Sequence, residues 1–351
     1  MVYPKIEISV EKYRHNVKKT KTMLADKSIN MMAVTKVFCA VKPLVDVLNE
    51  ESIQYLADSR LENLKKIDTN ALKVLLRLPS LSSVEETVKH ADISLNSEWT
   101  TINKLNETAK RLEKIHKIIL MIDVGDLREG VFYKENVSDL VKNIEQLNNI
   151  ELYGLGTNVT CYGGVLPTSE TTQKLVQLVK DVEKKIERKL TIISGGNSSH
   201  LAFLESTPSS INNLRIGEAL VLGRETSYGK ILEGLHEDVF ILKAEIIELK
   251  EKPTYPEGEI GMNAFGKTPE FEDKGNRRRA IISLGKQDVD YTELIPKDRS
   301  ISILGSSSDH IILDVTNSEF SYKVGDVLTF NLTYGSILSL MTSPYVEKDY
   351  V

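Results

Sequence analysis

Lys36 is the residue whose position most clearly suggests chemistry. It follows the apolar run Met31–Thr35, which is typical of a short buried strand. A lysine at the carboxyl end of the first strand of an α/β barrel points into the mouth where active sites form. A partly desolvated amine there can lose its charge near neutral pH and form a Schiff base with an aldehyde cofactor. Taken alone, Lys36 also fits an ordinary solvated loop lysine.

Two glycine-containing segments could bind an anion. Ser194–Ser199 has the sequence SGGNSS and lies at the end of a predicted strand. Leu214–Glu218 lies at the end of the next predicted strand and contains another glycine, Gly217. Consecutive glycines let backbone N–H groups approach an anion, and Asn or Ser can cap the following helix. The loops after strands 7 and 8 are the usual phosphate site of a barrel. Together they predict a phosphate site, although each alone also fits a capped turn.

Two further polar loops follow predicted strands 5 and 6. They are Asp123–Gly130, which contains Arg128, and Gly156–Gly164, which contains Cys161. Arg128 is either a functional cation or a solvated turn residue. Cys161 has little support as a nucleophile, because no histidine lies near it in sequence.

The elements that must position these residues alternate between strand and helix. Amphipathic stretches such as Ser97–Leu112 and Thr168–Arg188 separate short apolar runs. The pattern predicts an α/β fold, a closed (β/α)8 TIM-type barrel over residues 11–230. No GxGxxG follows the first strand, which argues against an open dinucleotide-binding sheet. The eight predicted strands are Met31–Thr35, Gln54–Ala57, Val74–Leu76, Asp92–Leu95, Lys117–Ile122, Glu151–Leu155, Leu190–Ser194 and Asn213–Ile216.

Beyond residue 230 the sequence becomes β-rich, with turn residues between apolar runs. We therefore expect a second, β domain formed by residues 1–10 and 231–351, with Ile6–Val10 as its first strand. Three of its loops stand out: Phe265-Gly266, Gly285–Asp288 and Gly305–His310. The later predicted strands are Val239–Leu249, Arg279–Leu284, Ile301–Leu304, Ile311–Val315 and Val327–Leu332.

Composition narrows the functional classes. The 351 residues are 41% hydrophobic and 27% charged, and a net charge of −5 with interspersed signs argues against nucleic acid as a partner. No apolar run is long enough to span a membrane. Two cysteines are too few for a disulfide framework, and the histidines lack metal-binding spacing, so we expect a cytoplasmic protein without a metal site.

Together these motifs resemble the fold-type III pyridoxal-phosphate enzymes, the family of alanine racemase. Val34-Thr35-Lys36 is similar to that family's Schiff-base lysine strand. Arg215 and Gly217 resemble its "R-x-G" motif, whose arginine meets the pyridine nitrogen. The resemblance adds further cofactor contacts: Arg128 at the phenolic oxygen, Asn197 and Ser198 in the phosphate loop, Tyr334 as a late phosphate-binding tyrosine, and Asn158 where alanine racemase carries a histidine beside its arginine.

The resemblance implies a pyridoxal 5'-phosphate-dependent amino-acid racemase with Lys36 as the catalytic lysine. It also implies a homodimer in which the β domain of one subunit completes the barrel mouth of the other. A permanent cation at Arg215 keeps the ring nitrogen unprotonated, which disfavours transamination and decarboxylation. The aligned second-base tyrosine is replaced by Phe265, which cannot carry a proton, so the second base is undefined.

Segments such as "VTKVFCA" and "GTNVTCYGGVLPT" are similar to the ornithine-racemising branch of the family. Ser308-Asp309 resembles a Cys-Asp pair of related decarboxylases, whose aspartate meets the distal ammonium of ornithine. Asp288 is the second candidate for this contact, and Asp309 also fits a turn aspartate. The alternatives are a racemase of lysine, arginine or alanine, a non-catalytic pyridoxal-phosphate carrier, a decarboxylase, which would carry a glutamate at Arg215, and a metal-assisted aldolase, whose metal ligands are absent from the sequence.

Overall fold

The computed structural model describes residues 2–351 of the chain. The chain divides into two compact units. One spans Val10–Glu237, and the other joins the N-terminal residues through Ser9 to Asp238–Val351. None of the helices in residues 2–351 has the length and apolar composition that a membrane span requires.

The unit Val10–Glu237 contains a closed barrel of eight parallel strands. Neighbouring strands pair in the order β5-β4-β3-β2-β10-β9-β8-β6, and pairing of β5 with β6 closes the ring. All eight predicted strands are present with boundaries shifted by a few residues, which confirms the predicted TIM-type barrel. The short β7 (Val131–Phe132) adds to the edge of β6 and was not predicted. The barrel strands are β2 (Asn30–Val34), β3 (Tyr55–Asp58), β4 (Leu72–Leu75), β5 (Ile93–Asn96), β6 (His116–Asp123), β8 (Ile150–Thr157), β9 (Ile192–Ser194) and β10 (Asn213–Ile216).

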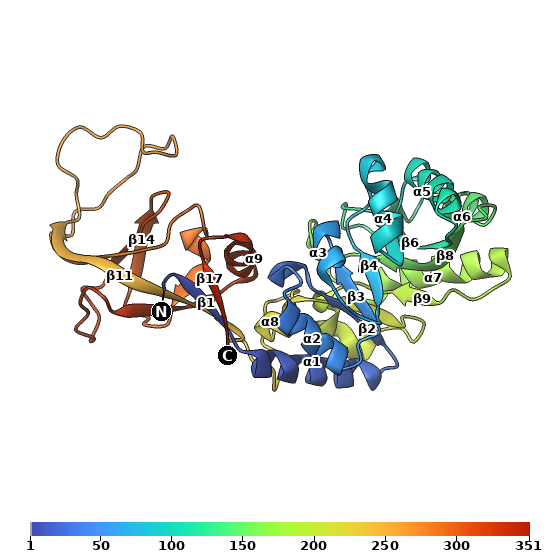
Figure 1. Cartoon of the computed structure of the whole chain (residues 1–351), viewed down its shortest axis with the longest axis horizontal. Helices are drawn as coiled ribbons and strands as arrows, with labels where there is room; N and C mark the ends of the chain where they lie inside the picture. The colour runs from blue at the N-terminus through green and yellow to red at the C-terminus, as the bar shows by residue number, and fades with distance from the viewer. Residues whose placement is uncertain (1) are drawn as a thin grey trace. The chain divides into compact units, whose positions relative to one another are not determined.

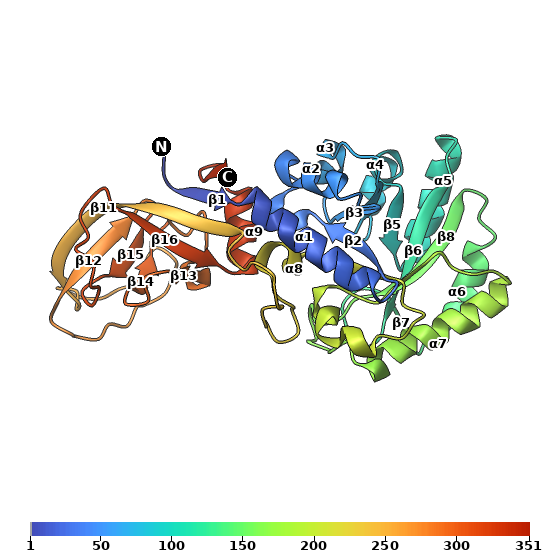
Figure 2. The same ribbon diagram turned by 90° about the horizontal axis from the view of Figure 1, so that it is seen from below.

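Helices surround this barrel, as Figures 1 and 2 show for α1, α5 and α7. The predicted helices near Ser97–Leu112 and Thr168–Arg188 are α5 and α7. Thr168 caps α7 by accepting a hydrogen bond from the backbone N–H of Thr171, which satisfies one of the free donors of the first turn. The helices are α1 (Val10–Ala25), α2 (Lys42–Glu50), α3 (Leu61–Lys66), α4 (Val84–His90), α5 (Trp99–Arg111), α6 (Val137–Ile144), α7 (Ser169–Ile186) and α8 (Glu218–Leu222), with 3-10 turns at Lys36–Phe38, Leu81–Ser83 and Ser198–Ser206.

The barrel interior is a packed apolar core. Alternate residues of each strand face inward, for example Met32 and Val34 on β2 and Ile119 and Met121 on β6. All four are buried. Because the interior is filled, the strand ends and the loops that follow them are the places where chemistry can occur.

The second unit is built on a mainly antiparallel sheet. Its central strand β11 pairs with β1, β12 and β16. Ile8 pairs with Phe240, so the N-terminal strand lies in this sheet. Strands β13 and β17 and helix α9 were not predicted. The elements are β1 (Lys5–Ile8), β11 (Phe240–Pro253), β12 (Asn276–Ile282), a 3-10 turn (Tyr291–Glu293), β13 (Leu294–Pro296), β14 (Ser302–Ser306), β15 (Ile311–Asp314), β16 (Val327–Leu332), α9 (Tyr334–Thr342) and β17 (Glu347–Tyr350).

Candidate active site

Five adjacent barrel strands carry the predicted cofactor residues at their carboxyl ends. In the order of the sheet these strands are β2, β10, β9, β8 and β6. They lead, in that order, to Lys36, to Arg215 and Gly217, to Asn197 and Ser198, to Asn158, and to Arg128. Parallel strands place their carboxyl ends at one end of the barrel, so these residues form one continuous arc.

Lys36 begins a tight turn directly after β2. The turn closes through Cys39 and Ala40, whose φ angles are 54° and 50°, a left-handed region that costs free energy in residues other than glycine. The carbonyl oxygen of Thr35 accepts hydrogen bonds from the backbone N–H groups of Phe38 (3.2 Å) and Ala40 (3.3 Å). Thr35 therefore holds the turn that presents Lys36.

Asp58, at the end of β3, anchors this turn from the neighbouring strand. The Thr35 hydroxyl donates a hydrogen bond of 2.6 Å to its carboxylate, which also accepts from Asn63 and from the N–H of Arg60. Asp58 is fully buried, and that burial raises the pKa of its carboxyl group. Sequence reasoning missed this residue, although a carboxylate at the end of a barrel strand is a signal that could have found it.

Arg215 points into the top of the barrel and is 4% exposed. Its guanidinium donates hydrogen bonds to the Ser194 hydroxyl (2.6 Å), the Thr157 carbonyl oxygen (2.6 Å) and Asn158 Oδ1 (3.2 Å). Burial lowers the pKa of Arg215 to about 10, so the group is still a cation at neutral pH. Glu129, Cys161 and Arg128 of the neighbouring polar loops make smaller electrostatic contributions to this pKa.

The side-chain amide of Asn158 has a hydrogen-bonded oxygen and an available nitrogen. Its Oδ1 accepts from Arg215 and from the Asn197 side chain (3.1 Å), which defines the orientation of the amide. The amide nitrogen Nδ2 is buried and has no hydrogen-bond partner in the described structure. Buried polar groups are normally paired, so this donor marks a place for a bound group.

Ser198 and Gly217 join the two predicted phosphate loops. The backbone N–H groups of Gly217 and Ala219 both donate to Ser198 Oγ at 3.3 Å. A Cβ atom on Gly217 would lie 3.2 Å from the Cβ of Val34, so glycine lets β10 approach β2 closely. The Ser198 hydroxyl occupies both donors and so ties the two loops together, and the phosphate site there stays a prediction.

Arg128 lies in a loop organised by two aspartates. Its side chain is 44% exposed and forms an ion pair with Glu129 at 2.6 Å. Asp123 accepts from the N–H groups of Gly125 and Leu127 and so shapes the turn that leads to Arg128. Turn chemistry therefore sets the loop that carries Arg128, and its role as a functional cation stays a prediction.

Asp126 fastens this loop to the next one. Its buried carboxylate accepts hydrogen bonds from four backbone N–H groups of the loop after β8, at 3.0–3.3 Å. The donors are Thr160, Cys161, Tyr162 and Val165. Nothing in the sequence pattern distinguished Asp126 from an ordinary turn residue.

Asp126→Ala is expected to lower the free energy of unfolding by about 3 kcal/mol, because four backbone N–H donors would lose a buried, charged acceptor. Urea denaturation measures this free energy of unfolding. It is followed by the fluorescence of Trp99, the only tryptophan of the chain, which lies with Asp126 in the unit Val10–Glu237. Asp181→Ala, on the exposed face of α7, is the matched control and should change stability by less than about 0.5 kcal/mol. A loss below about 1 kcal/mol in Asp126→Ala would contradict the clamping role.

The remaining predicted residues lie in the β domain. Tyr334 is the first residue of α9, whose N-cap is Thr333. Asp309 is exposed, and hydrogen bonds from the hydroxyls of Ser308 (2.9 Å) and then Ser307 (3.1 Å) lower the pKa of its carboxyl group. Asp288 is buried and accepts a hydrogen bond from the Ser343 hydroxyl at 2.7 Å.

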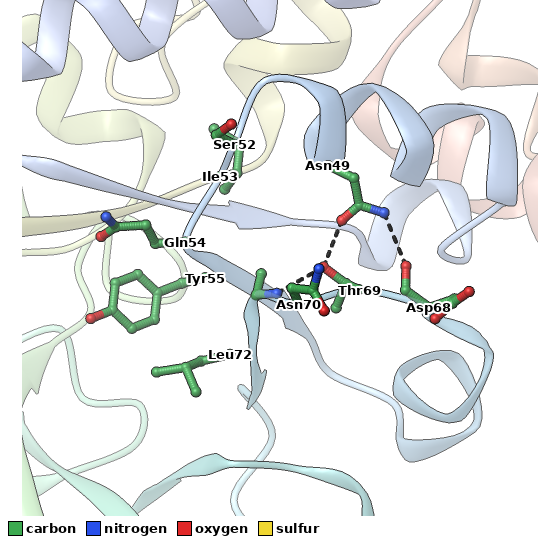
Figure 3. Close-up of a pocket in the computed structure, with 10 residues that line it drawn as sticks. Asn49, Ser52, Ile53, Gln54, Tyr55, Asp68, Thr69, Asn70 and Leu72 are labelled. Atoms are coloured by element: carbon green, nitrogen blue, oxygen red, sulfur yellow. Dashed lines mark hydrogen bonds between the residues drawn. The ribbon is translucent and has the colours of Figure 1, made fainter.

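A hollow of about 670 Å³ lies at the opposite end of the barrel (Figure 3). It is lined by the segments 52–55 and 68–72, which lead into β3 and β4, and by Asn49. Asn49 accepts from the Thr69 hydroxyl (2.6 Å) and donates to the carbonyl of Asp68 (2.9 Å), so these polar groups satisfy one another. Barrel chemistry takes place at the carboxyl ends of strands, and this hollow is at their amino ends.

Comparison with known proteins identifies the family of the chain. Residues 8–225 match the family model described as "Alanine racemase, N-terminal domain". The chain is 46% identical over 351 residues to the ornithine racemase of Acetoanaerobium sticklandii, covering 99% of each chain. It is 41% identical to the lysine racemase of Thermotoga maritima, covering 100% of this chain and 99% of that one. A solved alanine racemase from Bartonella henselae with covalently bound pyridoxal phosphate shares the fold, at 18% identity, 100% coverage of both chains and a TM-score of 0.75.

Proposed function

Because this chain belongs to the alanine racemase family, we propose that it is a pyridoxal-phosphate-dependent racemase that interconverts L- and D-ornithine. The observation that carries the proposal is the arc of residues from Lys36 to Arg128 on five adjacent strands, with a buried cation at Arg215. The two relatives above 40% identity bear the names ornithine racemase and lysine racemase.

The residues of the arc fit pyridoxal 5'-phosphate. The two glycine loops that Ser198 ties together would hold a phosphate, and the unpartnered Asn158 Nδ2 leaves a buried donor for the cofactor. Lys36 would bind the aldehyde carbon covalently. Arg215 would face the ring nitrogen as a hydrogen-bond donor, and Arg128 would face the phenolic oxygen. Tyr334 is proposed as a further phosphate contact, on the resemblance alone.

Side chains of the protein carry out the proton transfer and control the cofactor. The bound cofactor withdraws electrons from the α-carbon of the substrate and makes its proton acidic. The Lys36 amine, once released by the substrate, takes or returns that proton on one face. Arg215 remains a cation and keeps the ring nitrogen an acceptor, which limits reaction to proton exchange at the α-carbon. A group on the opposite face must complete the inversion.

Substrate identity is tested directly with a panel of enantiopure amino acids. Purified holoenzyme is incubated with ornithine, lysine, arginine and alanine, and the enantiomers are separated by chiral chromatography. We expect the highest kcat/KM for ornithine. A higher value for lysine would reassign the substrate and keep the reaction class, whereas no racemisation of any of the four would reject the class.

Asp309→Asn is expected to raise the KM for ornithine about 10- to 100-fold, because a charge-assisted hydrogen bond to the distal ammonium contributes about 1.5–3 kcal/mol. The absorption of the lysine-bound cofactor should not change. Asp273→Asn, which alters another turn aspartate of the same unit, is the control. Unaltered kinetics in Asp309→Asn would move the contact to Asp288, and an unaltered Asp288→Asn as well would leave ornithine without a carboxylate partner in these loops.

We further propose a homodimer in which the β domain of one subunit, residues 1–10 and 231–351, completes the barrel site of the other, residues 11–230. Co-expression of Lys36→Ala subunits with Asp309→Arg subunits should then give mixed dimers with about half of wild-type activity, because each mixed dimer contains one intact site of two. Activity is measured on dimers purified by two different affinity tags. A fully active monomer in sedimentation, or no recovery in the mixed dimer, would contradict the proposal.

A further inference from the structure

Three loops of the β domain form one cluster. They are the segment Asn263–Lys267 in the long connection between β11 and β12 (Figure 1), the segment Gly285–Asp288 after β12, and the segment Ser306–His310 between β14 and β15. We call them the three-loop cluster. The segments lie far apart in sequence, and backbone and side-chain contacts bring them together.

The backbone at Lys286 is held firmly by the adjacent loop. The N–H of Lys286 donates to the carbonyl of Ser307 and that of Gln287 to the carbonyl of Ser308, both at 3.0 Å. A Cβ atom at Gly285 would lie 2.3 Å from the backbone of Asp309, so only glycine permits this approach. The base of the Lys286 side chain therefore has a defined position.

The Lys286 ammonium lies over the face of Phe265, 4.1 Å from the ring centroid. This is a cation–π contact. Lys286 is exposed, and within residues 2–351 its ammonium makes no hydrogen bond or ion pair. Phe265, which cannot transfer a proton, is thus in contact with Lys286, whose ammonium can.

The other proton-carrying side chains of the cluster are engaged differently. Asp288 is buried and bound by Ser343. Asp309 accepts hydrogen bonds from two serine hydroxyls, and its carboxylate lies 3.3 Å from Nδ1 of His310. Lys267, the other ammonium of the cluster, is exposed and makes no ring contact within residues 2–351. The exposed Lys286 ammonium is held by the aromatic face and interacts electrostatically with Asp290, which leaves its N–H bonds available to a substrate.

We propose that Lys286 is the second proton carrier of the racemase and serves the face of the α-carbon opposite to Lys36. The inference rests on the proposed function and on its dimer. In one direction Lys36 removes the α-proton, the electron pair stays with the cofactor-bound substrate, and the Lys286 ammonium delivers a proton to the other face. In the reverse direction the neutral Lys286 amine removes the proton and Lys36 returns it, so protons and electrons balance.

The decisive experiment follows the α-hydrogen of each enantiomer separately. Wild type, Lys286→Met and Lys36→Ala holoenzymes are incubated in D2O with L-ornithine or D-ornithine, and deuterium incorporation and inversion are measured by mass spectrometry and chiral chromatography. We expect Lys286→Met to lose racemisation by about 10²- to 10⁴-fold. It should still exchange the α-hydrogen of one enantiomer, with retention, while exchange of the other falls with racemisation. Lys36→Ala should lose both exchanges.

Two variants separate proton transfer from charge and folding. Lys286→Arg keeps a cation for Phe265, but a guanidinium stays protonated and cannot act as a base, so it should behave like Lys286→Met. Lys267→Met removes another exposed ammonium, which like that of Lys286 interacts electrostatically with Asp290, and should leave racemisation within about twofold of wild type. Added ethylamine should partly restore racemisation in Lys286→Ala.

Racemisation that persists in Lys286→Met, or equal loss of exchange from both enantiomers, would overturn the assignment. One-sided exchange in His310→Asn with normal Lys286→Met would transfer the role to His310. If Lys36→Ala remained active, the proposed function itself would fail, which is a different outcome from failure of Lys286 alone.

Discussion

Lys36→Ala is expected to lower the rate of ornithine racemisation by at least about 10⁴-fold, because the variant loses the covalent cofactor anchor and one proton carrier together. The absorption band of the lysine-bound cofactor should disappear. Borohydride reduction followed by peptide mass spectrometry should label Lys36 in the wild type and no lysine in the variant.

The matched control is Lys42→Ala. Lys42 lies in the first turn of α2, six residues further along the chain, and forms an exposed ion pair with Asp46 at 2.7 Å. An exposed pair contributes little to stability, so Lys42→Ala should keep wild-type activity and labelling. A borohydride-stable adduct at any other lysine in Lys36→Ala would remove Lys36 from its role.

Arg215→Glu is expected to lower the kcat for racemisation about 100-fold and to allow measurable transamination. A carboxylate in place of the guanidinium favours a protonated ring nitrogen, which strengthens the cofactor as an electron sink. The loss corresponds to about 2.7 kcal/mol of activation free energy. The keto-acid product is detected by mass spectrometry alongside the enantiomer ratio.

Arg215→Glu also changes the packing, and this must be measured separately. The new carboxylate would face two hydrogen-bond acceptors, the Thr157 carbonyl and Asn158 Oδ1, which now bind the guanidinium. We therefore expect a lower thermal midpoint as well. Arg215→Lys keeps the cation and removes the bidentate geometry, so it should lose stability without gaining transamination. An unchanged product mixture in Arg215→Glu would show that residue 215 does not set the ring nitrogen's protonation.

The barrel was predictable because its signal is local. Each strand is a short apolar run between turn residues, and its order along the chain decides which loop follows which strand. That order alone places Lys36, Arg215 and the glycine loops at one end of the barrel. The strands missed in the β domain, Leu294–Pro296 and Glu347–Tyr350, are short or polar, and only pairing with distant strands defines them.

Loop contacts were decided by the tertiary structure. Asp126 and Asp58 look like turn residues in sequence, yet both are buried hydrogen-bond acceptors that hold the loops carrying Arg128 and Lys36. The ammonium of Lys286 and the ring of Phe265 come together only after the long connection between β11 and β12 and the loop after β12 have folded. The sequence alone was enough to predict which polar side chains lie at the strand ends, because strand order is a property of the chain. Only the tertiary structure shows which side chains hold these residues in place. Hydrogen bonds between distant loops depend on the course of the backbone, which a local sequence pattern does not predict.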